Sequence, residues 1–285
     1  MLPKTKLIFP ALLCLFFSQT AWSQKENYEV YALKFAAMGT HSSIADWADK
    51  GPVKDSIDIY FMVWLIKGKE GKNILLDAGF LNDIKDADEF AVKDYMRPDS
   101  TLLKLGLKPT DITDIIISHP HWDHIDGIDL FTNAHVWMQK EDFNYCVSAA
   151  WQKGGNHGGF NKRDIRKLLE LNLTGKLTLV DGDDKEIAPG VKVFTGSRHT
   201  YNSQYVLVET GSNKIVLASD NIWIYYNLEH LRPASTGGTF DTTGYIKTMQ
   251  RMKTQVSNTK FIIPGHDARI FSVFPKIAEG IVQIK

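Results

Sequence analysis

The sequence has little cysteine, and neither sign of charge is in excess. Its 285 residues include two cysteines, and 33 lysines and arginines balance 33 aspartates and glutamates. No basic run stands out, which argues against nucleic acid as the natural partner. Repeats and low-complexity tracts are lacking, and the hydrophobic fraction of 44% is ordinary, which excludes a disordered, collagen-like or coiled-coil chain. An enzyme or a small-molecule binder is the favoured class.

Long apolar runs are also lacking, except for one near the start. Residues 7–17 are apolar, Lys4 and Lys6 precede them, and the small-x-small site 21–23 follows. This order is typical of a secretory signal peptide, and a buried N-terminal helix would not explain it. The run is too short to span a bilayer, which takes about 20 apolar residues. We therefore expect a signal peptide at residues 1–23 and an exported protein that is periplasmic or secreted.

The rest of the chain, residues 24–285, is expected to form a single domain. Strands are predicted at 28–36, 57–67, 73–76, 115–117, 134–138, 191–195, 204–209, 214–218 and 261–263. Helices are predicted at 91–105, 164–171 and 240–255. Polar residues repeatedly follow the strand ends. The pattern favours an α/β layered architecture with its sites on loops at the carboxyl ends of strands.

The densest cluster of potential metal ligands follows the predicted strand 115–117. There His119, His121, Asp123 and His124 form the pattern H-x-H-x-D-H. Imidazole nitrogen and carboxylate oxygen are ligands that Zn²⁺ and related divalent metals prefer. His119 and His121 can point to one side of a strand end, while the next two ligands can reach a second position nearby. A polar loop whose histidines only satisfy backbone groups would not explain this clustering, so we expect bound metal.

Three further candidate ligands each follow an apolar strand and lie near a glycine or another small residue. They are His199, Asp220 and His266. Each alone could be a hydrogen-bonded loop residue, but together they supply the ligands that a second metal ion needs. We expect two divalent ions, with zinc favoured and iron, manganese and cobalt also suited to such a site.

These motifs resemble those of the metallo-β-lactamase superfamily along nearly all of residues 24–285. The resemblance implies an α/β fold, a four-layer αβ/βα sandwich with a dinuclear site at one edge. The implied ligands of the first metal ion are His119, His121 and His199. Those of the second are Asp123, His124 and His266. Asp220 resembles the bridging carboxylate, and Asp77 resembles an early acid that orients a metal-bound histidine, a simple turn carboxylate being the alternative.

Within the superfamily, Asp220 points to the glyoxalase II-like, lactonase-like and related hydrolases. The runs 196–204 and 264–267 look most like those of the N-acyl-homoserine lactonases, which open the lactone ring of bacterial quorum-sensing signals. Several of those enzymes have a tyrosine three residues after the bridging aspartate, where this chain has Trp223. The residues expected to contact substrate are Trp223, Tyr225, Tyr226, Trp151 and Phe160, with core packing as the alternative for each.

The resemblance implies an exported metal-dependent hydrolase whose substrate is a small lactone or ester. Two ions bridged by Asp220 would lower the pKa of a bound water to about 7, and the resulting hydroxide would attack the carbonyl carbon. Asp123 is the expected proton shuttle. A β-lactamase, a thioesterase or another ester hydrolase is the alternative enzyme, and a periplasmic zinc-binding protein without catalysis is the alternative of another class. The other histidines, including His41 and His135, are expected to be structural or surface residues.

Overall fold

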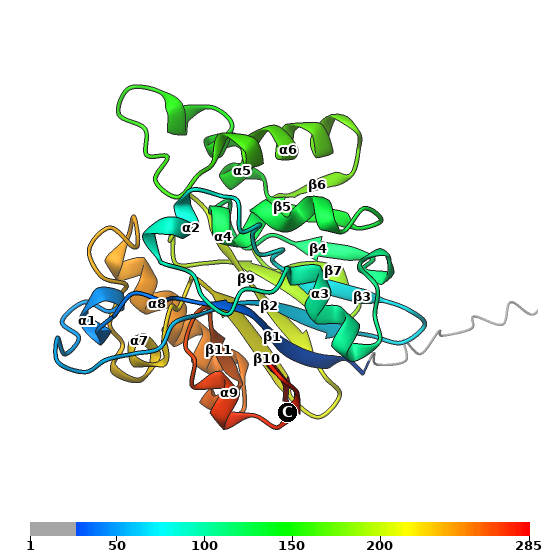
Figure 1. The fold of residues 1–285 in the computed structure, drawn as a ribbon. Coiled ribbons are helices and arrows are strands. Elements are labelled where there is room, and N and C mark those ends of the chain that lie inside the picture. The colour runs from blue at the N-terminus through cyan, green and yellow to red at the C-terminus, as the bar shows by residue number, and fades with distance from the viewer. Residues whose placement is uncertain (1–26) are drawn as a thin grey trace, which may run out of the picture.

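Two β-sheets pack face to face, and helices cover their outer faces (Figure 1). The computed structural model describes residues 27–285, so the expected signal peptide lies outside the described residues. From edge to edge, the first sheet contains β12 (Lys276–Ala278), β13 (Ile281–Ile284), β1 (Glu29–Ala37), β2 (Tyr60–Lys67), β3 (Asn73–Leu76), β4 (Asp114–Ile116), β5 (His135–Gln139) and β6 (Leu177–Val180). The second contains β11 (Ile262–Pro264), β10 (Lys214–Ser219), β9 (Gln204–Glu209), β8 (Val191–Thr195) and β7 (Lys185–Ala188).

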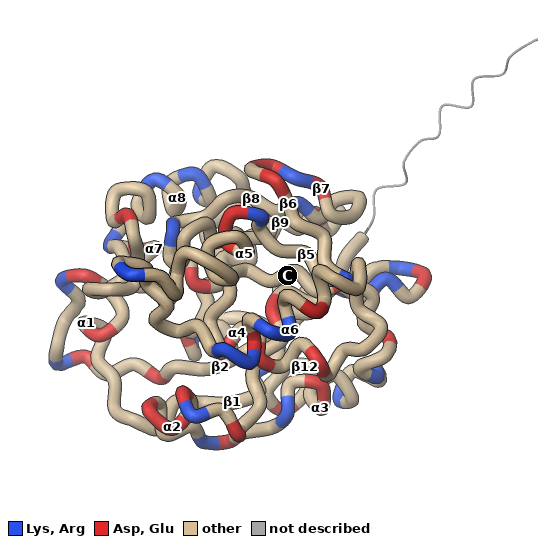
Figure 2. Tube along the Cα trace, turned by 90° about the horizontal axis from the view of Figure 1, so that it is seen from above, with Lys and Arg blue, Asp and Glu red and all other residues tan. Residues whose placement is uncertain are grey.

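The helices connect the strands and pack outside the sheets. The α-helices are α1 (Ile44–Trp47), α2 (Asp86–Glu89), α3 (Pro98–Leu102), α4 (Trp122–Ile125), α5 (Lys140–Cys146), α6 (Lys162–Leu173), α7 (Tyr225–His230), α8 (Thr242–Gln255) and α9 (Ile270–Val273). Short 3₁₀-helices are η1 (Leu103–Leu105), η2 (Pro109–Asp111), η3 (Asp126–Leu130), η4 (Ala149–Trp151) and η5 (Thr259–Phe261). No helix in the described part of the chain is long and apolar enough to cross a membrane. Figure 2 shows basic and acidic residues mixed along the chain.

Strand β2 shows why both faces of the first sheet are buried. Its sequence is almost continuously apolar, as expected for a strand covered on both sides. Trp64 and its alternate neighbours pack toward the second sheet, whereas Val63 and Leu65 pack toward the outer helices. Leu168 of α6 belongs to this outer cluster, and Met249 of α8 packs on the second sheet. The four layers that the resemblance implied are therefore confirmed.

The strands that precede the expected ligands all end at one edge of the sandwich. Strands β3 and β4 are parallel neighbours, as are β10 and β11, and β8 runs in the direction of β10 because two antiparallel pairings separate them. The carboxyl ends of parallel strands share one edge of a sheet, where binding sites commonly form. The residues brought to this edge are Asp77, His119, His199, Asp220 and His266.

The predicted helix at 91–105 is largely wrong. Lys93 instead forms an isolated bridge with Ala37, and a helix begins only at Pro98. Proline fits the first turn of a helix but disfavours helical geometry in the residue before it, and Arg97 is extended, with ψ at 135°. Strands β6, β7, β12 and β13 and helices α5 and α7 were not predicted. Strands β7 and β12 are mostly exposed and lack a strong apolar pattern.

Candidate metal centre

The loop after β4 positions four of the expected ligands. Helix α4 begins directly after His121, and its Trp122 and Ile125 are buried in the outer core. This burial turns Asp123 and His124 toward the edge of the sandwich. The backbone N–H of Ala78 donates to the carbonyl of His124 at 2.7 Å, which fixes the helix against the end of β3.

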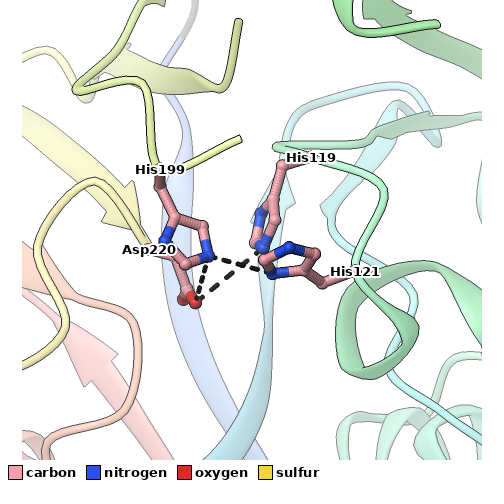
Figure 3. Close-up of side chains that lie close together, drawn as sticks. All are labelled: His119, His121, His199 and Asp220. Carbon is pink, nitrogen blue, oxygen red and sulfur yellow. Dashed lines mark hydrogen bonds and ion pairs between the residues drawn. The ribbon is translucent and has the colours of Figure 1, made fainter. Parts of the chain in front are cut away.

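The seven expected ligands come together in two adjacent groups. In the first, the ligand atoms of His119, His121, His199 and Asp220 lie within 4.8 Å of one another. The second consists of Asp123, His124 and His266 and meets the same limit. Figure 3 shows His119 and His121 on one side of the first group and His199 and Asp220, which come from two different segments, on the other.

Asp220 lies between the two groups and presents one carboxylate oxygen to each. Its Oδ2 is 3.2 Å from Nε2 of His199 and 3.8 Å from Nε2 of His119. Its Oδ1 is 3.0 Å from Nε2 of His266 and 3.4 Å from Nε2 of His124. This placement suits a carboxylate that is shared by two cations.

The remote ring nitrogens of four histidines are held by protein acceptors. Nδ1 of His119 faces Ser118 Oγ at 2.8 Å, and Nδ1 of His124 faces Asp77 Oδ2 at 2.8 Å. Nδ1 of His199 faces the carbonyl of Gly238 at 2.8 Å, and Nδ1 of His266 faces the carbonyl of Tyr60 at 3.1 Å. A histidine that donates its Nδ1–H in this way directs its Nε2 lone pair away from the partner, as metal-binding histidines do.

The buried polar atoms at the centre fit metal ions better than they fit one another. Nε2 of His119, Nε2 of His124 and Oδ1 of Asp220 are buried and have no hydrogen-bond partner among the described residues. Buried polar atoms without partners are costly and rare in folded proteins. Nitrogen and carboxylate donors aimed at a shared point are the donor set that divalent ions such as Zn²⁺ take. The residues therefore fit two metal ions.

His119, His121 and Asp220 of the first group are in the protonation state that binds metal. Burial, reinforced by neighbouring histidines, lowers the pKa of His119 far below its usual value and lowers the pKa of His121 to about 3. Burial opposes the charge of Asp220, but His266 and His124 outweigh it and hold the pKa of Asp220 well below its usual value. Both imidazoles are therefore neutral and the carboxylate is charged at neutral pH.

In the second group, metal must compete with protons. Burial disfavours a charged His124, but Asp123, Asp220 and Asp77 outweigh burial and raise its pKa well above the usual value. The pKa of His266 is also raised, because Asp220 and Asp123 outweigh its burial. Ligands must be deprotonated to bind metal, so metal uptake here releases protons.

Asp77 accepts hydrogen bonds from three residues at the metal centre. It is fully buried, and its φ of 63° places it in the left-handed region. Oδ1 accepts from the backbone N–H of Ser118 at 2.8 Å, and Oδ2 accepts from Ser219 Oγ at 2.9 Å as well as from His124. The structure therefore places Asp77 against a candidate ligand, as expected, rather than at a solvent-exposed turn.

Replacing Asp77 by asparagine is expected to weaken metal binding by about 10- to 100-fold, because His124 loses the charged acceptor that orients its ring. Titration of the metal-free protein with zinc against a chromogenic chelator measures the affinity. Asp94→Asn is the matched control, since Asp94 is an exposed carboxylate that pairs with Lys34. A folded Asp77→Asn protein with the parent's affinity would contradict this role.

A cavity of about 620 Å³ opens over the two groups. His121, Asp123, His199, Asp220 and His266 form one side of it. Apolar side chains form much of the remaining lining, among them Met38, Phe90, Trp122 and Phe240. The centre therefore faces a space that can take a small molecule with an apolar part.

Two of the five expected substrate contacts line this cavity, namely Trp223 and Phe160. The expectation is wrong for Trp151, whose ring stacks on His157 with centroids 4.8 Å apart and whose Nε1–H donates to a backbone carbonyl. It is also wrong for Tyr225 and Tyr226, which lie in α7. Helix α7 leads away from the cavity, so the ring of Tyr225 lies under Arg269 and that of Tyr226 stacks on His230.

Sequence reasoning missed the N-terminal segment that covers the centre. His41, Ser42, Asp46 and Trp47 line the cavity. His41 was expected to be a structural or surface residue, and it is exposed there. No motif or spacing marks these residues, and only the long-range pairing of the chain brings them here. His135 lies elsewhere, with its Nε2 2.7 Å from Thr178 Oγ1.

Comparisons with known proteins agree with this geometry. The family model described as the metallo-beta-lactamase superfamily matches residues 62–266. An N-acyl homoserine lactonase of Bacillus sp is 26% identical over 253 residues, which cover 83% of this chain and 92% of that protein. The N-acyl homoserine lactonase AiiB of Agrobacterium fabrum is 26% identical over 186 residues, which cover 64% of this chain and 66% of the relative.

Solved structures share the fold. One is an N-acyl homoserine lactone hydrolase with the product N-hexanoyl-L-homoserine at its catalytic metal centre, with a TM-score of 0.68 and 20% identity over 87% of this chain and 97% of that one. Another is AidC, a dizinc quorum-quenching lactonase in complex with a product, with a TM-score of 0.62 and 20% identity over 85% of this chain and 91% of that one.

Proposed function

The chain belongs to the metallo-β-lactamase superfamily and is a metal-dependent hydrolase, and from this premise we propose that it opens the ring of N-acyl-homoserine lactones. The observation that carries the proposal is the position of Asp220, between two groups of buried ligands that face an apolar cavity. The names of its relatives support the lactone substrate. Zinc is the proposed metal, supported by the dizinc centre of a protein with the same fold.

The residues around the cavity are proposed to bind the metal ions and to transfer the proton of the attacking water. Two bound divalent ions would lower the pKa of water and polarise the lactone carbonyl oxygen. Asp123 lines the cavity, and its side chain is 12% exposed. Its Oδ2 lies 3.3 Å from Nε2 of His124. As a carboxylate it can accept a proton from the attacking water and return it to the alkoxide that leaves when the ring C–O bond breaks. The product is a carboxylate with a free hydroxyl group.

An aromatic wall is proposed to hold the acyl chain. Phe240 lines the cavity and is 44% exposed. Its ring packs edge-on against Tyr145 at 6.4 Å, and Tyr145 stacks on Tyr201 at 4.5 Å. Tyr145 and Tyr201 are not part of the cavity lining, and we propose that with Phe240 they cover the end of a long chain.

Phe240→Ala is therefore expected to lower kcat/KM for a dodecanoyl lactone roughly fivefold, about 1 kcal/mol of lost apolar contact, and to change a butanoyl lactone much less. Steady-state kinetics on both substrates gives the comparison. Leu173→Ala, at a position that is 79% exposed on α6, is the control. Equal losses on both substrates would rule out a role in chain recognition.

The proposed reaction is tested with a panel of acyl-homoserine lactones, nitrocefin and a glutathione thioester. We expect acid release from the lactones by the zinc-loaded protein and little turnover of the other two. Turnover of nitrocefin or of the thioester alone would identify a β-lactamase or a thioesterase instead. Tight zinc binding without turnover of any ester or lactone would identify a metal-binding protein.

Export and domain extent belong to the same proposal. We propose that residues 24–285 form one mature domain, released when the signal peptide at residues 1–23 is removed, and that the domain acts in the periplasm or outside the cell. Expression of the full chain in a Gram-negative host, with cell fractionation and N-terminal sequencing, tests both points. A cytoplasmic protein that retains Met1 would overturn them.

A further inference from the structure

The indole of Trp223 donates its hydrogen bond to Asp220. Nε1 of Trp223 lies 2.8 Å from Oδ2 of Asp220, and this bond is formed inside the cavity that the ring lines. Residue 223 stands three positions after Asp220, where several of the lactonases that this chain resembles have a tyrosine. With its single N–H already used, the indole has no second donor for a substrate carbonyl.

The surrounding residues fix the indole in this position. Its ring packs edge-on against Trp47 at 5.3 Å and against His199 at 5.4 Å. A Cβ at position 238 would lie 2.2 Å from Cη2 of Trp223, so only glycine leaves room for the ring. The backbone carbonyl of Trp223 also accepts from the N–H of His266 at 2.9 Å. The residue is therefore tied to both ligand groups.

The two oxygens of Asp220 consequently have different surroundings. Oδ2 accepts from Trp223 and faces His199 at 3.2 Å, whereas Oδ1 faces His266 at 3.0 Å and has no hydrogen-bond partner among the described residues. A carboxylate without such a bond can rotate about its Cβ–Cγ bond. An N–H held against one oxygen selects the orientation in which each oxygen faces one group.

We propose that Trp223 is a positioning residue, which orients the carboxylate of Asp220 between the two metal-ligand groups instead of contacting substrate. The inference rests on the metal centre of the proposed function and does not depend on the lactone substrate. Hydrogen-bonding partners of metal ligands commonly change metal affinity by 10- to 100-fold when they are removed.

The test is Trp223→Phe, which keeps an aromatic ring and removes the N–H. Metal-free protein is titrated with Zn²⁺ against a chelator, and the visible absorption of the Co²⁺-loaded protein reports on ligand geometry. We expect at least about a 10-fold loss of Zn²⁺ affinity and a changed Co²⁺ spectrum. If the proposed hydrolysis is also observed, kcat at subsaturating metal should fall while KM for the lactone stays within about twofold.

Trp137→Phe is the matched control. Nε1 of Trp137 also donates to a buried carboxylate, that of Asp114 at 2.9 Å, but at the opposite end of the strands. This variant should keep the parent's Zn²⁺ affinity and Co²⁺ spectrum. A Trp223→Phe protein with unchanged affinity and spectrum but a raised KM would overturn the proposal and indicate a substrate contact.

Two further measurements keep the test decisive if Trp223→Phe does not fold. Trp223→Gln retains an N–H donor without adding an imidazole ligand, and we expect it to bind Zn²⁺ more tightly than Trp223→Ala. In the unaltered protein with ¹⁵N-labelled indoles, one N–H resonance should be protected from exchange and should shift as Zn²⁺ is added. If no indole resonance responds, the proposal is wrong. The metal titrations, the Co²⁺ spectrum and the NMR experiment use no lactone. They therefore test the role of Trp223 even if the protein does not hydrolyse lactones.

Discussion

Replacing Asp220 by alanine is expected to remove hydrolytic activity and to lower the metal content of the purified protein together. Each oxygen of this carboxylate faces one ligand group, so the substitution takes a donor from both. It also removes the carboxylate nearest to His266 and one of the three carboxylates that raise the pKa of His124. We expect kcat/KM to fall by roughly three orders of magnitude or more, about 4 kcal/mol of transition-state stabilisation.

Elemental analysis and lactone kinetics on the same preparation measure both effects. Asp220→Asn keeps the shape of the side chain and removes its negative charge. We expect this variant also to lose metal, because an amide is a weaker donor to divalent ions. His135→Ala is the control, since His135 bonds Thr178 and belongs to neither ligand group. Full activity in a folded Asp220→Ala protein, or a comparable loss in His135→Ala, would mean that the ligands are wrongly assigned.

The convergence of the ligands could be predicted from the sequence because it follows from strand direction. The H-x-H-x-D-H loop is local, so its four ligands must lie close together wherever the loop is placed. His199, Asp220 and His266 are distant in sequence, but each follows an apolar strand. Strands β8, β10 and β11 run in the same direction, and their carboxyl ends therefore carry all three residues to one edge.

The partners that orient the ligands could not be predicted in the same way. His199 and His266 donate to the backbone carbonyls of Gly238 and Tyr60, and any residue type offers a carbonyl. The cavity wall formed by residues 38–47 likewise depends on long-range pairing, such as the hydrogen bond from the backbone N–H of Ser235 to the carbonyl of Trp47. These contacts carry no motif, and only the three-dimensional structure reveals them.

A buried pair of carboxyl groups is another feature that the sequence did not predict. Asp126 and Asp164 are both fully buried, and the two N–H groups of Arg163 reach the two oxygens of Asp126 at 2.6 Å. Burial opposes the charge of Asp126, but hydrogen bonds from Arg163 and from the backbone N–H of Leu81 outweigh it and lower its pKa to about 2. Burial, followed by the nearby Asp126, raises the pKa of Asp164 to about 8. Asp164 therefore holds a proton at neutral pH, and the ion pairs of Arg163 and Lys167 with Asp126 hold helix α6 against the segment that follows the metal-binding loop.

This raised pKa makes the stability of the protein depend on pH in a defined direction. An unfolded aspartate titrates near pH 3.9, whereas folded Asp164 titrates near 8. Its contribution is fully present below about pH 4 and is progressively lost as pH rises to about 8, because only the unfolded chain releases the proton in this range. Asp164→Asn should remove this dependence, since an amide does not titrate.

The expected result is that the unfolding free energy of Asp164→Asn, minus that of the parent, increases by about 1 kcal/mol per pH unit from pH 5 to 7 and less steeply from pH 7 to 8. Urea unfolding of both proteins at pH 5, 6, 7 and 8 measures this difference, in which the pH dependence of all other groups cancels. Asp129→Asn is the control, because Asp129 also pairs with Lys167 but its side chain is 62% exposed. Parallel stability curves for Asp164→Asn and the parent would show that Asp164 is already ionised in the folded protein, and that the charges of Arg163 and Lys167 alone hold the pair together.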